Sequence, residues 1–433
     1  MKHPMSIDEP NPSNSLPEMF SLRQHFSKPP PLTVSETVQQ EIRGMTDAIR
    51  PGMKIAIGVG SRGITNLQII VGEAIKALTA AGARPFIIPA MGSHGGATSE
   101  AQTALLAEYG ISEAAIGAPI RGDMSTGLIG HTEEKGEIVW AKTALEADGI
   151  MVINRIKPHT DFAGKIGSGL IKMAVVGLGK RVGASNFHRA ASRTGYEVSL
   201  RERIRVISQK TKFLGGLGLI EDQSHQTAHI EWVPNDSLEE REEVLFNRAS
   251  DLMPKIPFDQ VDLLIVDRIG KNISGAGMDP NVIGRSVHGY LTSPQKNPDG
   301  LTARRIFVRD LTPETHGNAI GIGLADMTTR RLVEAMDHSV TFINALTALS
   351  TNGAKIPIYF DTDKEAICRV LDTLALNKLQ DARIIRIQDT LNLTRFQASE
   401  AYLAETESRT DLSVESAPKL MKFTNEQQLT PMD

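Results

Sequence analysis

Short apolar runs alternate with amphipathic segments over the first half of the chain. The run "KIAIGVG" at 54–60 has the length of a buried strand, whereas 65–82 repeats its apolar residues with the helical period and ends at a glycine. The segment 99–110 predicts another helix, with Ser99 and Gln102 in the spacing of a capping box. Further elements are predicted as a strand at 84–92 and a helix followed by a strand at 138–154. This alternation is typical of an α/β fold with ligands at the carboxyl ends of parallel strands.

A second series of strand and helix patterns begins after residue 259. A buried strand is predicted at 261–270, and a glycine-rich turn follows it. Further strands and helices are predicted at 304–311, 326–337 and 355–376. We therefore expect two α/β domains with mainly parallel sheets, at 36–259 and 260–395.

The two ends of the chain lack these patterns. Residues 1–35 include "KPPPLT", which fits neither a sheet nor a helix interior, so we expect a flexible N-terminal arm. Residues 396–433 become polar, and we expect the end of this segment to be disordered. Whether the segment returns to the first domain stays open.

Composition narrows the class of protein. The 433 residues are 40% apolar and 23% charged, with a net charge of −4, which provides no basic surface for nucleic acid. The single cysteine, Cys368, excludes a disulfide scaffold and a zinc site built on thiolates. The start of the chain has no apolar signal-peptide core, and no stretch is long and apolar enough to span a membrane. We expect a soluble cytoplasmic protein without nucleic-acid or membrane partners.

The loop after the first predicted strand, "GVGSRGITN", matches the glycine-rich pattern G-x-G-x-x-G. Gly58, Gly60 and Gly63 would let backbone N–H groups approach a phosphate, and Arg62 would add a bidentate donor. A dinucleotide fold also needs an acidic residue at the end of the next strand, but that strand ends in "AMGSHGG". The glycines are thus equally consistent with an anion site and with a structural turn.

Two further loops carry histidines and lysines. His94 follows the second strand and precedes a helix, which favours function, although a lone histidine is more often structural. The segment 155–188 holds His159, Lys165, Lys172, Lys180 and His188. Lys172 lies inside an apolar run, where its ammonium must either extend to solvent or meet an anion. Two histidines on separate strand ends could present two bases to one small substrate, and a prebuilt cofactor is plausible.

These residues resemble the motifs of the nickel-dependent lactate racemase family, whose members carry a nickel-pincer nucleotide (nickel pyridinium-3,5-bisthiocarboxylic acid mononucleotide). The matching segments are "SRG" (61–63), "GSHGG" (92–96) and "HTDFAG…SGLIK…NFH" (159–188). The resemblance extends over about residues 50–390 and is densest in the first domain. It departs from the family in the first loop, which lacks an acid, and by one residue inserted between His159 and Phe162.

The resemblance implies a role for each of these residues. His94 and His159 correspond to the two catalytic histidines, His188 to the protein ligand of nickel, and Lys172 to the lysine that tethers the cofactor. The further cofactor contacts that it implies are Gly60, Ser61, Arg62 and Lys165. In the second domain, Arg268 or Lys271 would bind the substrate carboxylate, and Lys271 is equally consistent with a solvated turn. The active site would lie in the cleft between the two domains.

The implied activity is that of an isomerase: a racemase or epimerase that inverts C2 of a 2-hydroxy acid by reversible hydride transfer to the cofactor. Cofactor-biosynthesis proteins would be partners, and a homo-oligomer stays open. The departures from the family leave the tether at Lys172 open and favour a substrate larger or more polar than lactate, such as malate or an aldonic acid. Two alternatives remain: an NAD(P)-dependent hydroxy acid dehydrogenase, and a non-catalytic protein that binds a metal or a nucleotide.

Overall fold

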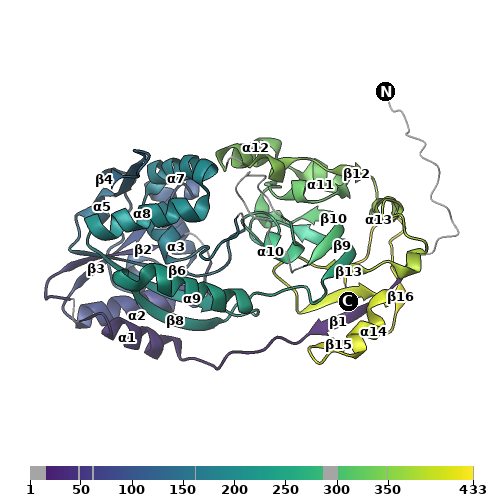
Figure 1. Cartoon of the computed structure of the whole chain (residues 1–433), viewed down its shortest axis with the longest axis horizontal. Helices are drawn as coiled ribbons and strands as arrows, with labels where there is room; N and C mark the ends of the chain where they lie inside the picture. Colours follow the sequence, from purple (N-terminus) through teal and green to yellow (C-terminus); the bar gives the residue numbers. More distant parts are fainter. Residues whose placement is uncertain are drawn as a thin grey trace. The chain divides into compact units, whose positions relative to one another are not determined.

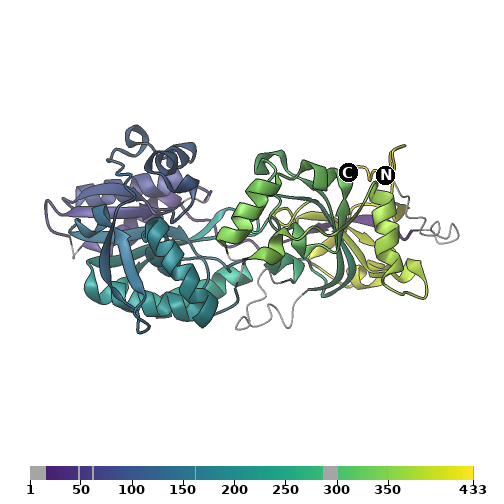
Figure 2. The same ribbon diagram turned by 90° about the horizontal axis from the view of Figure 1, so that it is seen from above.

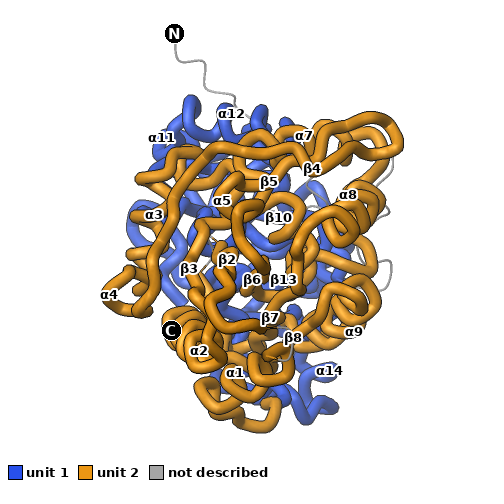
Figure 3. The backbone as a smooth tube through the Cα atoms, turned by 90° about the vertical axis from the view of Figure 1, so that its left-hand side faces the viewer, with its two compact units in different colours: residues 1–27, 254–289, 294–433 blue, residues 28–253, 290–293 orange. Residues whose placement is uncertain are grey.

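The computed structural model describes residues 16–46, 49–60, 63–160, 162–285, 301–348 and 350–432. These residues form two compact units. Unit 2 is made of residues 28–253, and unit 1 of residues 16–27, 254–285 and 301–432 (Figure 3). Unit 2 ends at Met253, whereas the boundary between the two domains was predicted at residue 259. Unit 1 is assembled from segments that lie before and after unit 2 in the chain.

Unit 2 contains a five-stranded sheet in the order β3-β2-β6-β7-β8. The first four strands are parallel, and β8 runs antiparallel to β7. The strands are β2 (Lys54–Val59), β3 (Arg84–Pro89), β6 (Gly149–Arg155), β7 (Phe213–Glu221) and β8 (Thr227–Pro234), and a separate hairpin is formed by β4 (Thr126–His131) and β5 (Glu137–Ala141).

Helices cover both faces of this sheet. Ile55, Ile57 and Val59 of β2 belong to the core that contains α1 and α2, whereas Ala56 faces the core that contains α7, α8 and α9. Because both faces are buried, the strand has an almost continuous apolar sequence. The helices are α1 (Val34–Arg43), α2 (Leu67–Ala80), α3 (Ser99–Glu108), α4 (Glu113–Ile116), α5 (Lys142–Leu145), α6 (Leu170–Lys172), α7 (Lys180–Thr194), α8 (Tyr196–Lys210) and α9 (Leu238–Asp251).

Unit 1 contains a nine-stranded sheet in the order β12-β11-β10-β9-β13-β14-β1-β15, with β16 also paired to β1. The strands from β12 to β13 are parallel, and the rest are antiparallel. The strands are β1 (Glu18–Gln24), β9 (Gln260–Ile269), β10 (Thr302–Leu311), β11 (Met327–Thr329), β12 (Ile358–Phe360), β13 (Ile384–Ile387), β14 (Arg395–Ser399), β15 (Leu412–Val414) and β16 (Lys419–Leu420). The helices are α10 (Pro280–Ile283), α11 (Arg330–Ala335), α12 (His338–Thr347), α13 (Asp363–Asp372) and α14 (Leu403–Glu407).

The first described residues differ from the flexible arm expected over residues 1–35. Strand β1 pairs with β14 in the register Phe20 to Ala398, and it lies among the C-terminal strands (Figures 1 and 2). Phe20 and Leu22 are fully buried, because alternate residues of β1 point into the core of unit 1. The free energy of burying these side chains holds the segment in the sheet.

The C-terminal segment also differs from its prediction. Strands β14, β15 and β16 belong to unit 1, so residues 396–432 do not return to the first domain. Near the end, Leu429 is buried, its N–H donates to Asp363, and its carbonyl accepts from Arg309. These contacts order a polar segment that has few apolar residues of its own.

The predicted α/β class with mainly parallel sheets is confirmed. The antiparallel edge of unit 1 was not predicted. Among the described residues, no helix combines the length and the apolar character that crossing a membrane requires.

Candidate active site

Strands β3, β2 and β6 are neighbours in the sheet of unit 2, and they are parallel. The chain segments that follow these strands hold the site residues predicted in the first domain. Parallel neighbours end at the same edge of a sheet, so the fold brings the three loops to one edge. The chain order also reverses here, because β3 and β6 lie on opposite sides of β2. This is the position at which α/β sheets usually bind ligands.

Gly58 lies within β2, and Gly60 directly follows the strand. A Cβ atom on Gly60 would lie 2.6 Å from the terminal methyl carbon of Met173, and one on Gly58 would lie 3.1 Å from a methyl carbon of Val152. The packing favours the structural explanation of Gly58. At Gly60 the near atom is the end of the flexible Met173 side chain, so the packing does not decide between an anion site and a structural turn there. The predicted cofactor residues Ser61 and Arg62 lie outside the described residues.

The loop after β3 carries His94, whose side chain is exposed. The predicted capping box is wrong, because Thr98 is the N-cap of α3 and accepts from Ala101. Gln102 instead donates to the carbonyl oxygens of Gly92 and His94, at 3.1 and 3.0 Å. The side chain of Gln102 is fully buried, so it fixes this loop from beneath.

The same loop contacts the segment that follows Lys172. The N–H of Gly92 donates to the carbonyl of Gly177 at 3.1 Å, and a Cβ atom on Gly92 would lie 3.2 Å from the carbonyl oxygen of Val176. Gly177 ends a π-helical turn, Met173–Gly177, which directly continues α6. Such turns are rare and occur often at functional sites.

The loop after β6 places His159 inside the protein. Its side chain is only 6% exposed, and Nε2 contacts Nζ of Lys172. The imidazole also stacks on Phe162, with the ring centres 4.5 Å apart. From the sequence, the ammonium of Lys172 was expected either to extend to solvent or to meet an anion. In the structure it contacts the imidazole of His159 instead, and the side chain is half-buried.

A tyrosine extends this group to His188. The hydroxyl of Tyr196 is 3.1 Å from Nδ1 of His188, and the Tyr196 ring stacks on Phe162 at 4.7 Å. Tyr196 is buried and begins α8, whereas His188 is half-buried in α7. We call His159, Phe162, Lys172, His188 and Tyr196 the imidazole cluster. Sequence reasoning missed Tyr196, whose only local signal was an aromatic residue after the helix-breaking Gly195.

Two ionisable groups of unit 2 are buried and have shifted pKa values. Burial lowers the pKa of Lys180 to about 8, while Asp123 opposes this change; Nζ of Lys180 donates to the carbonyl of Pro89 at 2.7 Å. Burial raises the pKa of Glu242 to about 7, against hydrogen bonds from Ile171 and Leu170. Neither residue was given a role from sequence.

Three other predicted residues make contacts with residues outside the imidazole cluster. The side chain of Lys165 is exposed, and its backbone N–H donates to Glu197. Arg268 and Lys271 belong to unit 1, where Arg268 pairs with the buried Asp389 at 3.0 Å and Lys271 donates to the carbonyl of Gly275 at 2.8 Å. Their assignment to substrate binding stays a prediction.

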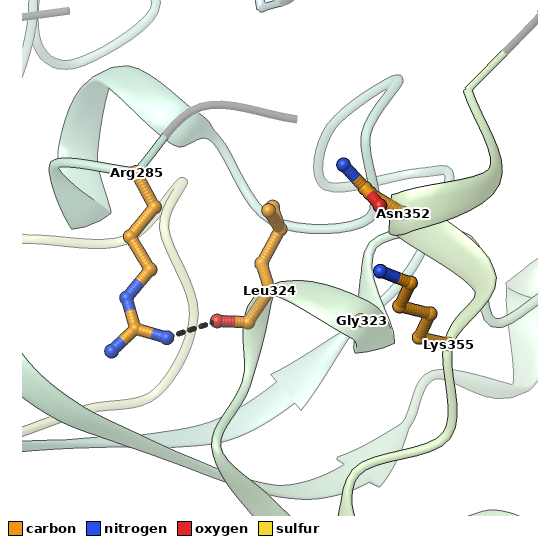
Figure 4. A pocket seen from close by; sticks show the side chains of 5 residues that line it. All are labelled: Arg285, Gly323, Leu324, Asn352 and Lys355. Carbon is orange, nitrogen blue, oxygen red and sulfur yellow. Dashed lines mark hydrogen bonds between the residues drawn. The ribbon is translucent and has the colours of Figure 1, made fainter. Parts of the chain in front are cut away.

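A cavity of about 320 Å³ in unit 1 does not contain any predicted site residue. The residues that line it are Arg285, Gly323, Leu324, Asn352 and Lys355 (Figure 4). Arg285 donates to the carbonyl of Leu324 at 2.7 Å and pairs with Asp326 at 2.6 Å, so its charge is compensated within the unit.

The part of the chain that the structure describes contains no group of three or more His, Cys, Asp or Glu side chains able to hold a metal ion. A metal at His188 would therefore need most of its ligands from a bound group. The Tyr196 contact is at Nδ1, so such a metal would be held through Nε2, and an orienting partner on the second nitrogen is typical of metal-binding histidines. The residues present fit a cofactor that carries its own donor atoms.

The fold of this chain is similar to that of two solved structures. No protein-family model matches the sequence, and no curated protein matches it. A protein from Thermotoga maritima, solved in a structural-genomics programme, is 13% identical, with 80% of this chain and 92% of that chain covered and a TM-score of 0.52. The lactate racemase apoprotein from Thermoanaerobacterium thermosaccharolyticum is 15% identical, with 86% and 93% covered and a TM-score of 0.51. At these identities the likeness concerns the fold alone, and the chain shares the fold of that lactate racemase apoprotein.

Proposed function

We propose that the protein is a racemase or epimerase of 2-hydroxy acids that uses a nickel-pincer nucleotide. The observation that carries the proposal is the imidazole cluster, in which Lys172 contacts His159 and Tyr196 links their aromatic neighbour Phe162 to His188. His159 and Phe162 of the cluster follow β6, whose carboxyl end lies at the same edge of the sheet as those of β2 and β3. The shared fold with a lactate racemase apoprotein supports the same class of reaction.

The substrate explains why an acid–base residue is needed. The C2 hydrogen of a 2-hydroxy acid is poorly acidic, because the adjacent carboxylate is already negative. When bound, the cofactor would supply an acceptor for this hydrogen, which leaves the hydroxyl proton to the protein. A well-placed histidine contributes on the order of 10²–10⁴ to the rate of such a proton transfer.

We assign this proton to Nε2 of His159, the nitrogen that Lys172 contacts. Lys172 would hold the cofactor, and Nε2 of His159 would take the proton of the substrate hydroxyl. His94, on the loop that Gln102 fixes, would serve the opposite face of the substrate. His188 would hold the metal and Tyr196 would orient His188.

The test is to produce the protein with and without the enzymes that make the pincer nucleotide. The first preparation should bind about one nickel per chain and invert C2 in at least one acid of a broad panel, measured by chiral chromatography. His159→Gln should retain nickel and lose inversion, whereas His131→Gln, at an exposed histidine of β4, should behave as wild type.

Three outcomes would contradict the proposal. The first is the absence of nickel together with the absence of inversion across lactate, malate and aldonic acids. The second is net oxidation of the acids with NAD or NADP, which would favour a dehydrogenase. The third is a wild-type protein that binds nickel or a nucleotide but inverts none of the acids, which would favour a binding protein.

A further inference from the structure

Glu242 is a carboxyl group in the interior of unit 2. It lies on α9, and its side chain is fully buried. Oε2 accepts from the backbone N–H of Ile171 at 2.9 Å, and the N–H of Leu170 also donates to this carboxyl group. Oε1 has no hydrogen-bond partner among the described residues. A buried carboxyl group with so few partners is costly, so its presence calls for an explanation.

The chain makes room for this carboxyl group at Gly169. A Cβ atom on Gly169 would lie only 2.3 Å from Oε1 of Glu242, so the carboxyl group could not keep its present position beside any larger residue. The carbonyl of the same glycine accepts from Asn154 at 2.8 Å, close to the end of β6. The Gly169 peptide is thus held between a strand and α9.

The contact lies at the start of the helix that carries Lys172. The first N–H groups of a helix have no partner within it, so an oxygen acceptor there fixes the direction of the first turn. Helix α6 consists of Leu170–Lys172, and Lys172 contacts His159. Any rotation of this turn would move Nζ of Lys172 away from the imidazole.

We propose that Glu242 is a positioning residue, whose buried carboxyl group caps α6 and thereby directs Lys172 at His159. The geometry concerns the chain alone, and only its consequence for catalysis rests on the proposed function. The charged group that acts on Glu242 from the neighbouring α8 is Arg201, which is itself paired with Glu197, Glu239 and Glu243. Arg201 is therefore compensated without Glu242.

The experiment measures the reactivity of Lys172 in the full-length protein without cofactor or substrate. Limited acylation with an acetylating reagent, followed by peptide mass spectrometry, gives the labelling rate at Lys172. Glu242→Leu removes the acceptor and should raise that rate about fivefold, the scale of a lost helix cap. Glu242→Gln retains an oxygen acceptor and should stay within about twofold of wild type, as should Glu240→Leu, which alters an exposed position of the same helix.

The chemical shift of His159, followed by NMR of histidine-labelled protein, provides a second reading that general loosening of the fold would not produce selectively. It should change in Glu242→Leu and not in Glu240→Leu.

A folded Glu242→Leu protein with wild-type labelling and shift would overturn the proposal, and so would a glutamine variant as reactive as the leucine variant. If the leucine variant does not fold, Glu242→Asp decides, because the shorter side chain withdraws the acceptor; wild-type labelling of that variant would overturn the proposal. Because no measurement here needs turnover, failure of the proposed function would leave these results unchanged.

Discussion

Removal of the buried ammonium of Lys180 gives a sharp test of the electrostatics of unit 2. The side chain is fully buried and donates a hydrogen bond to the carbonyl of Pro89. Burial lowers its pKa from an ordinary 10.5 to about 8. Lys180→Met keeps an unbranched side chain of similar length and removes the charge.

The sign of the effect follows from the two pKa values. Between about pH 8 and pH 10.5 the unfolded chain binds a proton at this lysine that the folded protein has released, so the free energy of unfolding of the wild type rises with pH. Below pH 8 both states carry the proton, and the charge costs the folded state about 3 kcal/mol. The variant lacks this cost at every pH. It also leaves the Pro89 carbonyl without its donor, a cost of about 1–3 kcal/mol that does not depend on pH.

Urea unfolding at intervals from pH 7 to pH 10.5 measures the difference. Relative to the wild type, the variant should be about 3 kcal/mol more favourable at pH 7 than at the upper end of the range. Other lysines and tyrosines titrate equally in both proteins, so they cancel in the comparison. Lys142→Met, at an exposed lysine, should give a difference that is flat with pH. A flat difference for Lys180→Met, or one that changes in the opposite direction, would refute the reasoning.

Three further predictions concern packing and the loops of the site. Gly216→Ala should lower the free energy of unfolding in urea by more than about 2 kcal/mol, because the new Cβ atom would lie 2.8 Å from a backbone carbonyl oxygen of the neighbouring strand; unchanged stability would contradict the packing described. Gln102→Leu should speed hydrogen exchange of the loop that carries His94, since two carbonyl groups lose their donor, and wild-type exchange would show that the loop is fixed in another way. Tyr196→Phe keeps the stacked ring and removes the partner of His188. If the proposed function holds, it should reduce nickel affinity about 10–100-fold in a competition with a chelator, while wild-type affinity would exclude an orienting role.

The alternation of strands and helices could be predicted from sequence because each element carries its own pattern. Strand β1 could not, because its partner β14 lies at the other end of the chain and prolines surround its few apolar residues. The capping box failed for a similar reason: the buried Gln102 is drawn to the carbonyls of a preceding loop, and Thr98 takes the cap.

The candidate site shows the same division between local and distant information. His159 and Lys172 attracted notice because one follows a strand and the other interrupts an apolar run. Tyr196 and Glu242 did not, since a tyrosine after a glycine and one glutamate among several in "SLEEREEVLF" have no unusual local pattern. Their importance comes from partners on other elements, which only the fold brings close.

The way in which unit 2 interrupts unit 1 has a consequence for synthesis on the ribosome. Strand β1 leaves the ribosome before unit 2, whereas its partner Ala398 in β14 is made only after residues 28–253. At about 5–20 residues per second, β1 waits on the order of 20–75 s with Phe20 and Leu22 unburied. Unit 2 is continuous and can fold during this interval. Strand β1 is thus made before unit 2 but can pair only after it, and the emerging chain is the state in which we expect chaperones to be needed most.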